Sequence, residues 1–186
     1  MQEDLALAEY TALRATIRER GTLRSAVAAL TFLLWAGLAL AVALFTAAPL
    51  LVLLPLAALA GGFETVLGLH VGVERVGRFI QARYELSSAS LPGWEHAAME
   101  FGLSTRAGLA LDPLFSALFA GSTALNLLLA ARAGFDVHAV RGVGILVVVT
   151  VAHALLLLRI WTGRRFAATQ RAIELERFRV RPPKAD

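Results

Sequence analysis

The sequence predicts an all-α protein, a compact bundle of four transmembrane helices. Of its 186 residues, 58% are hydrophobic and only 17% are charged, whereas soluble chains are near half apolar and a quarter charged. No Lys, Arg, Asp or Glu occurs from Ser25 to Phe63. We therefore expect lipid to be the solvent for much of a single membrane domain covering residues 1–186.

The charge-free stretch is too long for one helix, at about 1.5 Å per residue across a hydrocarbon core of roughly 30 Å. Ala47-Ala48-Pro49 divides it, because proline suits the first turn of a helix. Asp112 is placed to cap another helix beginning at Pro113, and Trp161 suits an interfacial position at the end of the last. The predicted spans are residues 26–46, 50–73, 113–131 and 142–161.

The basic residues predict the direction of the bundle. Sixteen of the 18 Lys and Arg residues precede the first span, lie between the second and third, or begin at Arg159, and only Arg132 and Arg141 fall in the outer connections. The positive-inside rule then places both termini in the cytoplasm, with the bundle in the inner (cytoplasmic) membrane. The first span is not expected to be a cleaved signal peptide, because its apolar core is long and Glu3-Asp4 is acidic.

Three segments beside the spans are predicted to form a cytoplasmic layer. Residues 1–21 have a helical apolar stripe and end at Gly21. Residues 74–111 continue the second helix and then form a loop, and residues 162–181 form an amphipathic helix before Pro182-Pro183. These helices either lie on lipid headgroups and on each other, or form a docking surface for another subunit. The apolar residues of the first stripe are Ala6, Tyr10, Leu13 and Ile17.

Glu64 and His153 are the main candidates for intramembrane chemistry. Counted from the predicted inner ends of their spans, they lie about 13 Å and roughly 10 Å deep. An ionised group at such a depth is expensive, so Glu64 is expected at a helix–helix seam, protonated or paired, and not on the lipid face. The matching depths make the two residues a candidate pair. That pair is either a satisfied interior contact or a site that handles protons or cations.

Other residues in the spans favour packing. Asn126, closer to the outer side, is expected to make an interhelical hydrogen bond. A stripe of small residues along the second span predicts the close approach of another helix. Its members are Ala57, Gly61, Gly68 and Gly72.

The spacing His-x-x-x-Glu occurs twice near the predicted inner boundary. It places both side chains of each pair on one helix face, where two pairs can surround a divalent metal. Solvated, salt-bridged helix faces are the alternative. A haem held by His70 and His153 is a further alternative in a four-helix bundle. The metal candidates are His70, Glu74, His96 and Glu100.

Composition and motifs exclude several function classes. Cysteine is absent, which excludes disulfides and thiol chemistry. The pI near 10.6 reflects arginines beside apolar spans, which indicates anionic lipid and not nucleic acid as the partner. No phosphate-binding glycine loop or hydrolytic triad is found. The first hypothesis is therefore a non-enzymatic membrane subunit of a homo-oligomer or larger complex, without a cofactor. The alternatives are a small proton or cation channel or carrier using Glu64 and His153, and a metal- or haem-binding redox protein.

Overall fold

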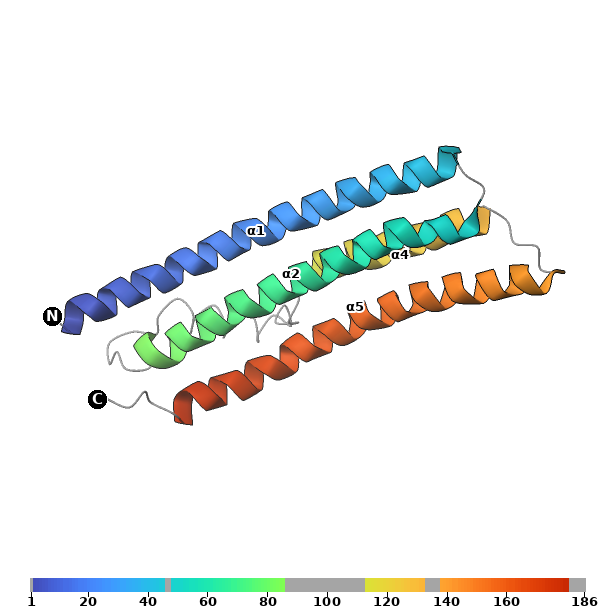
Figure 1. The fold of residues 1–186 in the computed structure, drawn as a ribbon. Helices are drawn as coiled ribbons and strands as arrows, with labels where there is room; N and C mark the ends of the chain where they lie inside the picture. Colours follow the sequence, from blue (N-terminus) through green and yellow to red (C-terminus); the bar gives the residue numbers. More distant parts are fainter. Residues whose placement is uncertain (1, 46–47, 86–112, 133–137, 181–186) are drawn as a thin grey trace. The chain divides into compact units, whose positions relative to one another are not determined.

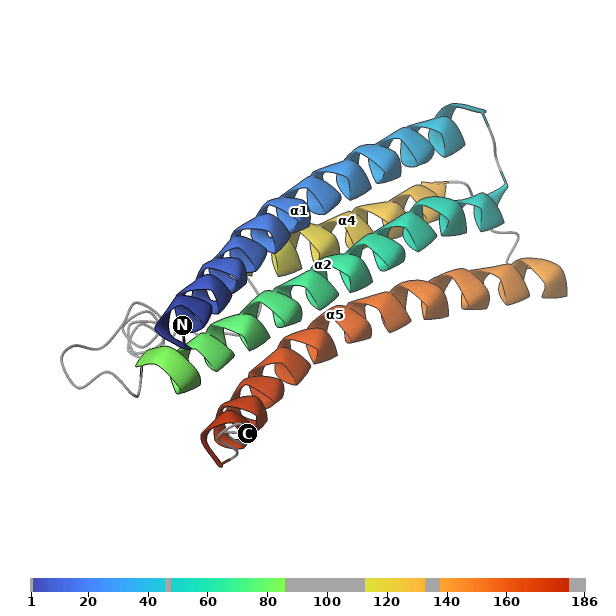
Figure 2. The same ribbon diagram turned by 60° about the vertical axis from the view of Figure 1, so that its left-hand side comes forward.

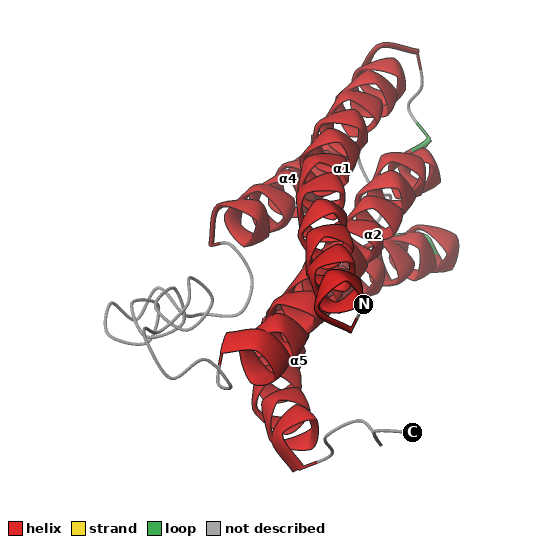
Figure 3. Ribbon diagram, turned by 90° about the vertical axis from the view of Figure 1, so that its left-hand side faces the viewer, coloured by secondary structure: helices red, strands yellow, loops and turns green. Residues whose placement is uncertain are grey.

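A computed structural model describes residues 2–45, 48–85, 113–132 and 138–180, and every regular element in these ranges is helical (Figure 3). Four helices within the described residues are long and apolar enough to cross a membrane. The all-α prediction with four candidate spans is confirmed. The elements, labelled in Figure 1 where there is room, are α1 (Gln2–Phe45), the 3₁₀ turn η1 (Pro49–Val52), α2 (Leu53–Ile80), the π-helical turn η2 (Gln81–Glu85), α4 (Pro113–Arg132) and α5 (Val140–Val180).

The helix boundaries agree with the sequence in some places and differ in others. Pro113 begins α4 and Pro49 begins η1, as expected for proline in a first helical turn. The helix end predicted at Gly21 is wrong, because α1 runs through it from Gln2 to Phe45. Likewise, α5 is continuous from Val140 to Val180, so the predicted span and cytoplasmic helix are one element. Of the predicted connection over 74–111, residues 86–111 lie outside the described residues.

The chain forms two compact units, although the sequence predicts one membrane domain. The apolar unit comprises Ser25–Leu67 and Asp112–Gly163. The charged unit comprises Met1–Arg24, Gly68–Leu111 and Arg164–Asp186. Helices α1, α2 and α5 each contribute to both units, whereas α4 belongs to the apolar unit alone.

Aromatic contacts hold the centre of the apolar unit together. Phe119 of α4 packs against Phe32 of α1 and Phe63 of α2, with ring centroids 4.9 and 5.4 Å apart. Phe63 and Phe119 are fully buried. Both views in Figures 1 and 2 accordingly show α4 beside α2. Near the far end of α4, Val52, Ala130 and Val149 form a second buried cluster.

Glycine permits a close helix approach in the apolar unit. A Cβ atom on Gly62 would overlap the side chain of Thr31 on α1, which is itself buried. Thr31 cannot easily move aside, because its hydroxyl donates to the Val27 carbonyl at 2.8 Å. A Cβ on the adjacent Gly61 would meet nothing within 4 Å. Gly62, which the small-residue stripe omitted, is therefore a packing glycine of α2.

The charged unit combines aromatic and polar contacts. Tyr84 packs edge-on against Tyr10 of α1, with centroids 5.5 Å apart, and donates a hydrogen bond to Glu9 at 2.7 Å. Phe79 of α2 packs against Phe178 of α5 at 5.6 Å. The turn η2 thus contacts α1 and helix α2 contacts α5 in this unit, consistent with the apolar stripes predicted from helical spacing.

We expect Gly62→Ala to be less stable than Gly61→Ala by about 1–3 kcal/mol, the usual cost of overpacking. Both variants gain the same helix propensity, so their difference isolates the contact with Thr31. Unfolding of the two purified variants by SDS titration measures the difference in their free energies of unfolding. Equal stability of the two variants would show that α1 and α2 do not meet at Gly62.

Candidate functional site

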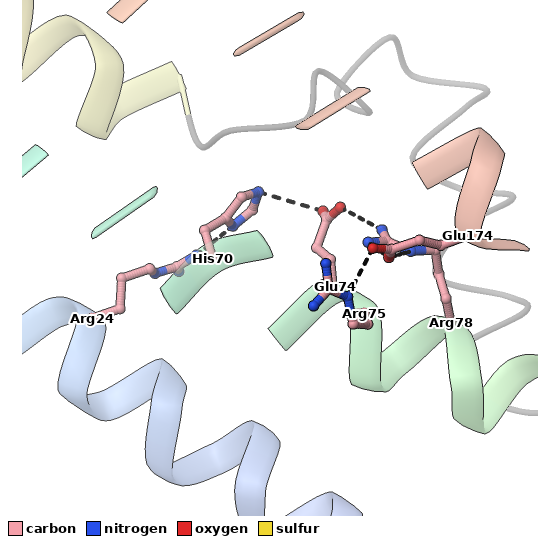
Figure 4. A network of polar contacts seen from close by, with 6 residues as sticks. All are labelled: Arg24, His70, Glu74, Arg75, Arg78 and Glu174. Carbon is pink, nitrogen blue, oxygen red and sulfur yellow. Dashed lines mark hydrogen bonds and ion pairs between the residues drawn. The ribbon is translucent and has the colours of Figure 1, made fainter. Parts of the chain in front are cut away.

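A network of charged side chains lies in the charged unit (Figure 4). Glu174 of α5 accepts hydrogen bonds from Arg78 at 2.6 and 3.1 Å and from Arg75 at 2.8 Å, both on α2. Arg78 also donates to Glu74, one turn earlier, at 2.9 Å. The Arg78 side chain is 3% exposed and that of Glu174 is 8% exposed. So buried an ion pair needs further hydrogen bonds to offset the loss of water, and here Glu74 accepts one from Arg78 and Arg75 donates one to Glu174.

The network changes the ionisation of Glu174. Burial by itself raises the pKa of this carboxyl, but hydrogen bonds from Arg78 and Arg75, together with their charges, outweigh burial and hold the pKa below its ordinary value. Glu174 is therefore ionised at neutral pH, where it fastens α5 to α2.

His70 extends the network to α1. Arg24 approaches the Nδ1 atom of His70 at 2.9 Å, and the His70 Nε2 atom lies 3.5 Å from Glu74. Because a guanidinium only donates, Nδ1 accepts, and Nε2 carries the proton that faces Glu74. The predicted pairing of His70 with Glu74 on one helix face is thus observed, but as a polar contact shared with two arginines. His96 and Glu100 lie outside the described residues, and the residues that are described contain no group of three or more metal-ligating side chains.

A second polar cluster lies in the core of the apolar unit. Asn126 of α4 donates to the Val52 carbonyl at 2.9 Å, and its amide nitrogen lies 3.0 Å from His153 Nε2. The Asn126 carbonyl oxygen accepts a long hydrogen bond of 3.4 Å from Trp35. Asn126 and His153 are both 0% exposed. The cluster therefore joins α1, η1, α4 and α5 through one buried amide.

These contacts determine which ring nitrogen of His153 carries the proton. The Asn126 amide nitrogen faces the Val52 carbonyl, which only accepts, so its second hydrogen points at His153 Nε2. Nε2 therefore accepts, while Nδ1–H donates to the Val149 carbonyl at 2.7 Å. Both ring nitrogens of a neutral imidazole are satisfied. Haem ligation by His153 would require one of these bonds to break.

Glu64 pairs with Arg159 of α5, and the predicted Glu64–His153 pair is wrong. Arg159 contacts the carboxylate bidentately, with Nε–Oε1 at 2.6 Å and Nη2–Oε2 at 2.8 Å. The side chains of Glu64 and Arg159 are 49% and 42% exposed. Glu64 does reach across a helix–helix seam, but at the surface of the apolar unit and not in its interior.

Within the part of the chain that the structure describes, the predicted small-residue stripe is not a packing seam. Ala57, Gly61 and Gly68 are exposed, and a Cβ on either glycine would meet nothing within 4 Å. Only Gly72 is approached, by the Arg20 guanidinium, 2.7 Å from the Cβ position. The stripe therefore leaves a face of α2 uncovered.

Sequence analysis missed the partners in the charged network and at Glu64, namely Arg24, Arg78, Glu174 and Arg159. The charge count had assigned the three arginines to membrane orientation and did not include Glu174. No protein-family model, curated protein or solved structure matches the chain. Function must therefore be inferred from these clusters, in a protein whose four apolar helices suggest a multi-pass membrane protein.

Replacing Glu174 with Gln should destabilise the charged unit by about 3–5 kcal/mol at neutral pH, because it leaves Arg78 buried beside a neutral amide. A depressed carboxyl pKa stabilises the fold above the ordinary glutamate pKa of about 4.3, and this is lost as pH falls through the folded-state pKa. The gap between wild type and Glu174→Gln should thus close on acidification below about pH 4. Thermal unfolding in detergent across pH measures it, with the exposed Glu176→Gln as control. A constant gap would contradict the network.

Asn126→Leu should destabilise the apolar unit by about 1–3 kcal/mol for each buried group left without its partner, notably His153 Nε2 and the Val52 carbonyl. A double-mutant cycle with His153→Leu measures the coupling free energy. If the two side chains interact, the double variant loses less stability than the sum of the two single variants. Strictly additive losses would show that Asn126 and His153 do not interact.

Proposed function

We propose that this protein is a non-enzymatic subunit of a membrane complex, with the apolar unit in the inner (cytoplasmic) membrane and the charged unit in the cytoplasm. The asymmetric distribution of arginines supports cytoplasmic termini. It also supports contact with anionic lipid headgroups, and gives no reason to invoke nucleic acid.

The observation that carries this proposal is the charged unit itself. Three of the four candidate spanning helices continue into it, and the buried Arg78–Glu174 pair fastens two of them together. Several large apolar side chains in this unit remain exposed. A preformed helical surface of this kind suits docking of another subunit. The exposed side chains are Leu5, Leu7 and Leu23 of α1, and Phe166 and Ile173 of α5.

The polar clusters favour assembly over transport or redox chemistry. A proton or cation pathway would need Glu64 and His153 in one chain of groups, whereas each has its own separate partners. A histidine that ligates metal or haem needs one nitrogen for the iron or metal, and both nitrogens of His70 and of His153 are engaged. These side chains hold helices together.

The protein extracted in mild detergent should migrate as a complex larger than one 19.9-kDa chain, either with itself or with other subunits. Native mass spectrometry from lipid nanodiscs measures the mass. Exchange of Phe166 and Ile173 for Ser should reduce association with a different subunit. A single chain without partners, at all protein-to-lipid ratios, would overturn the proposal.

A further inference from the structure

We propose that a second copy of this chain docks on the face of α2 around Glu64, related to the first by a two-fold axis along the membrane normal. This proposal rests on the proposed function, because it takes the apolar unit to lie in the bilayer. It adds the identity of one partner and the residues of the contact.

The ion pair between Glu64 and Arg159 is incomplete as an intramembrane contact. Two guanidinium N–H groups face the carboxylate in the bidentate pair, which leaves three N–H donors of Arg159. No further acceptor for them is found in the described residues. The carboxylate likewise keeps lone pairs on its exposed side. Lipid chains offer neither donors nor acceptors, so a half-exposed pair in the apolar unit needs a polar partner.

The surroundings of the pair allow such a partner to come close. Gly61 and Ala57 lie one and two turns before Thr65 on the same exposed face of α2. The Thr65 hydroxyl is already satisfied by the Gly61 carbonyl at 2.9 Å. The face is therefore flat and uncharged except at Glu64, and two helix backbones can approach closely across it.

Charge complementarity identifies the occupant as a second copy. A two-fold axis along the membrane normal places each residue at the same depth as its equivalent, so each Arg159 can donate to the other copy's Glu64. The four groups then form a closed ring of alternating charges. A lipid phosphate would satisfy Arg159 but not Glu64, whereas a second copy satisfies both.

Cysteine cross-linking tests the contact directly, since the chain has no cysteine of its own. Gly61 would lie near the two-fold axis, so Gly61→Cys should form a disulfide-linked dimer when membranes are oxidised. Gly121→Cys on α4 is the matched control, because Gly121 is also exposed with nothing within 4 Å of its Cβ position. Equal cross-linking at the two positions, or none at Gly61, would overturn the proposal.

Association measurements separate this proposal from the broader one. Glu64→Gln and Gly61→Leu should each raise the dimer dissociation constant in detergent about tenfold, as loss of one interhelical contact does. Gly121→Leu should not. If the wild type self-associates and neither α2 variant weakens it, or if it binds only other subunits, the Glu64 contact is wrong and the subunit role stands. If the wild type is a partner-free monomer, both fail.

Discussion

The free-energy cost of removing a charge from water determines where the charged side chains of this protein lie and which partners they have. The apolar unit contains few charges. Its first segment, Ser25–Leu67, has no charged residue before Glu64, and its second segment, Asp112–Gly163, contains α4 and the apolar part of α5. Where ionisable groups do leave water, each has a charged or hydrogen-bonding partner. Arg78 is almost fully buried because Glu174 and Glu74 both accept from it. Without these partners, burial would favour the neutral carboxyl and leave a guanidinium that cannot deprotonate.

The number of candidate spans and their helical type followed from the sequence, but the merging of two spans with the neighbouring cytoplasmic helices did not. Pro113 and Pro49 fix helix starts by local geometry, which sequence shows directly. Gly21 predicts an end because glycine disfavours helix by about 1 kcal/mol. That penalty is small beside the packing of Tyr10 against Tyr84 and of Thr31 against Gly62, on either side of it. Tertiary contacts therefore override the local preference.

The partner of Glu64 was mispredicted because its depth was counted from the wrong residue. Placing the inner end of the second span at residue 73 put Glu64 deep, level with His153. The compact apolar unit ends at Leu67 on α2 and at Gly163 on α5, which gives a common reference level on the two helices. Counted from these residues, Glu64 and Arg159 each lie about one turn inside, as their 2.6 Å contact requires. The end of the charge-free stretch was the better guide to this boundary.

The choice between Gly61 and Gly62 shows a second limit of sequence reasoning. Successive residues on a helix differ by about 100° in direction, so adjacent glycines face different surroundings. Spacing identified a stripe through Gly61, but only the neighbouring helix reveals that Gly62 meets Thr31. Sequence periodicity shows which residues share a face of a helix, whereas the position of the neighbouring helix determines which face is covered.

The three polar clusters differ in how completely other residues of the same chain pair their hydrogen-bonding and charged groups. Asn126 and His153 are neutral and fully buried, and the side-chain nitrogen and oxygen atoms of both residues make hydrogen bonds. Glu174 is ionised and receives two arginines. Glu64 has one arginine, and both groups remain half exposed on a unit whose other surface is suited to lipid. A half-exposed charged pair in that position gains stability in a bilayer when something polar covers it. The Glu64–Arg159 pair is therefore the feature on which the proposed self-association depends.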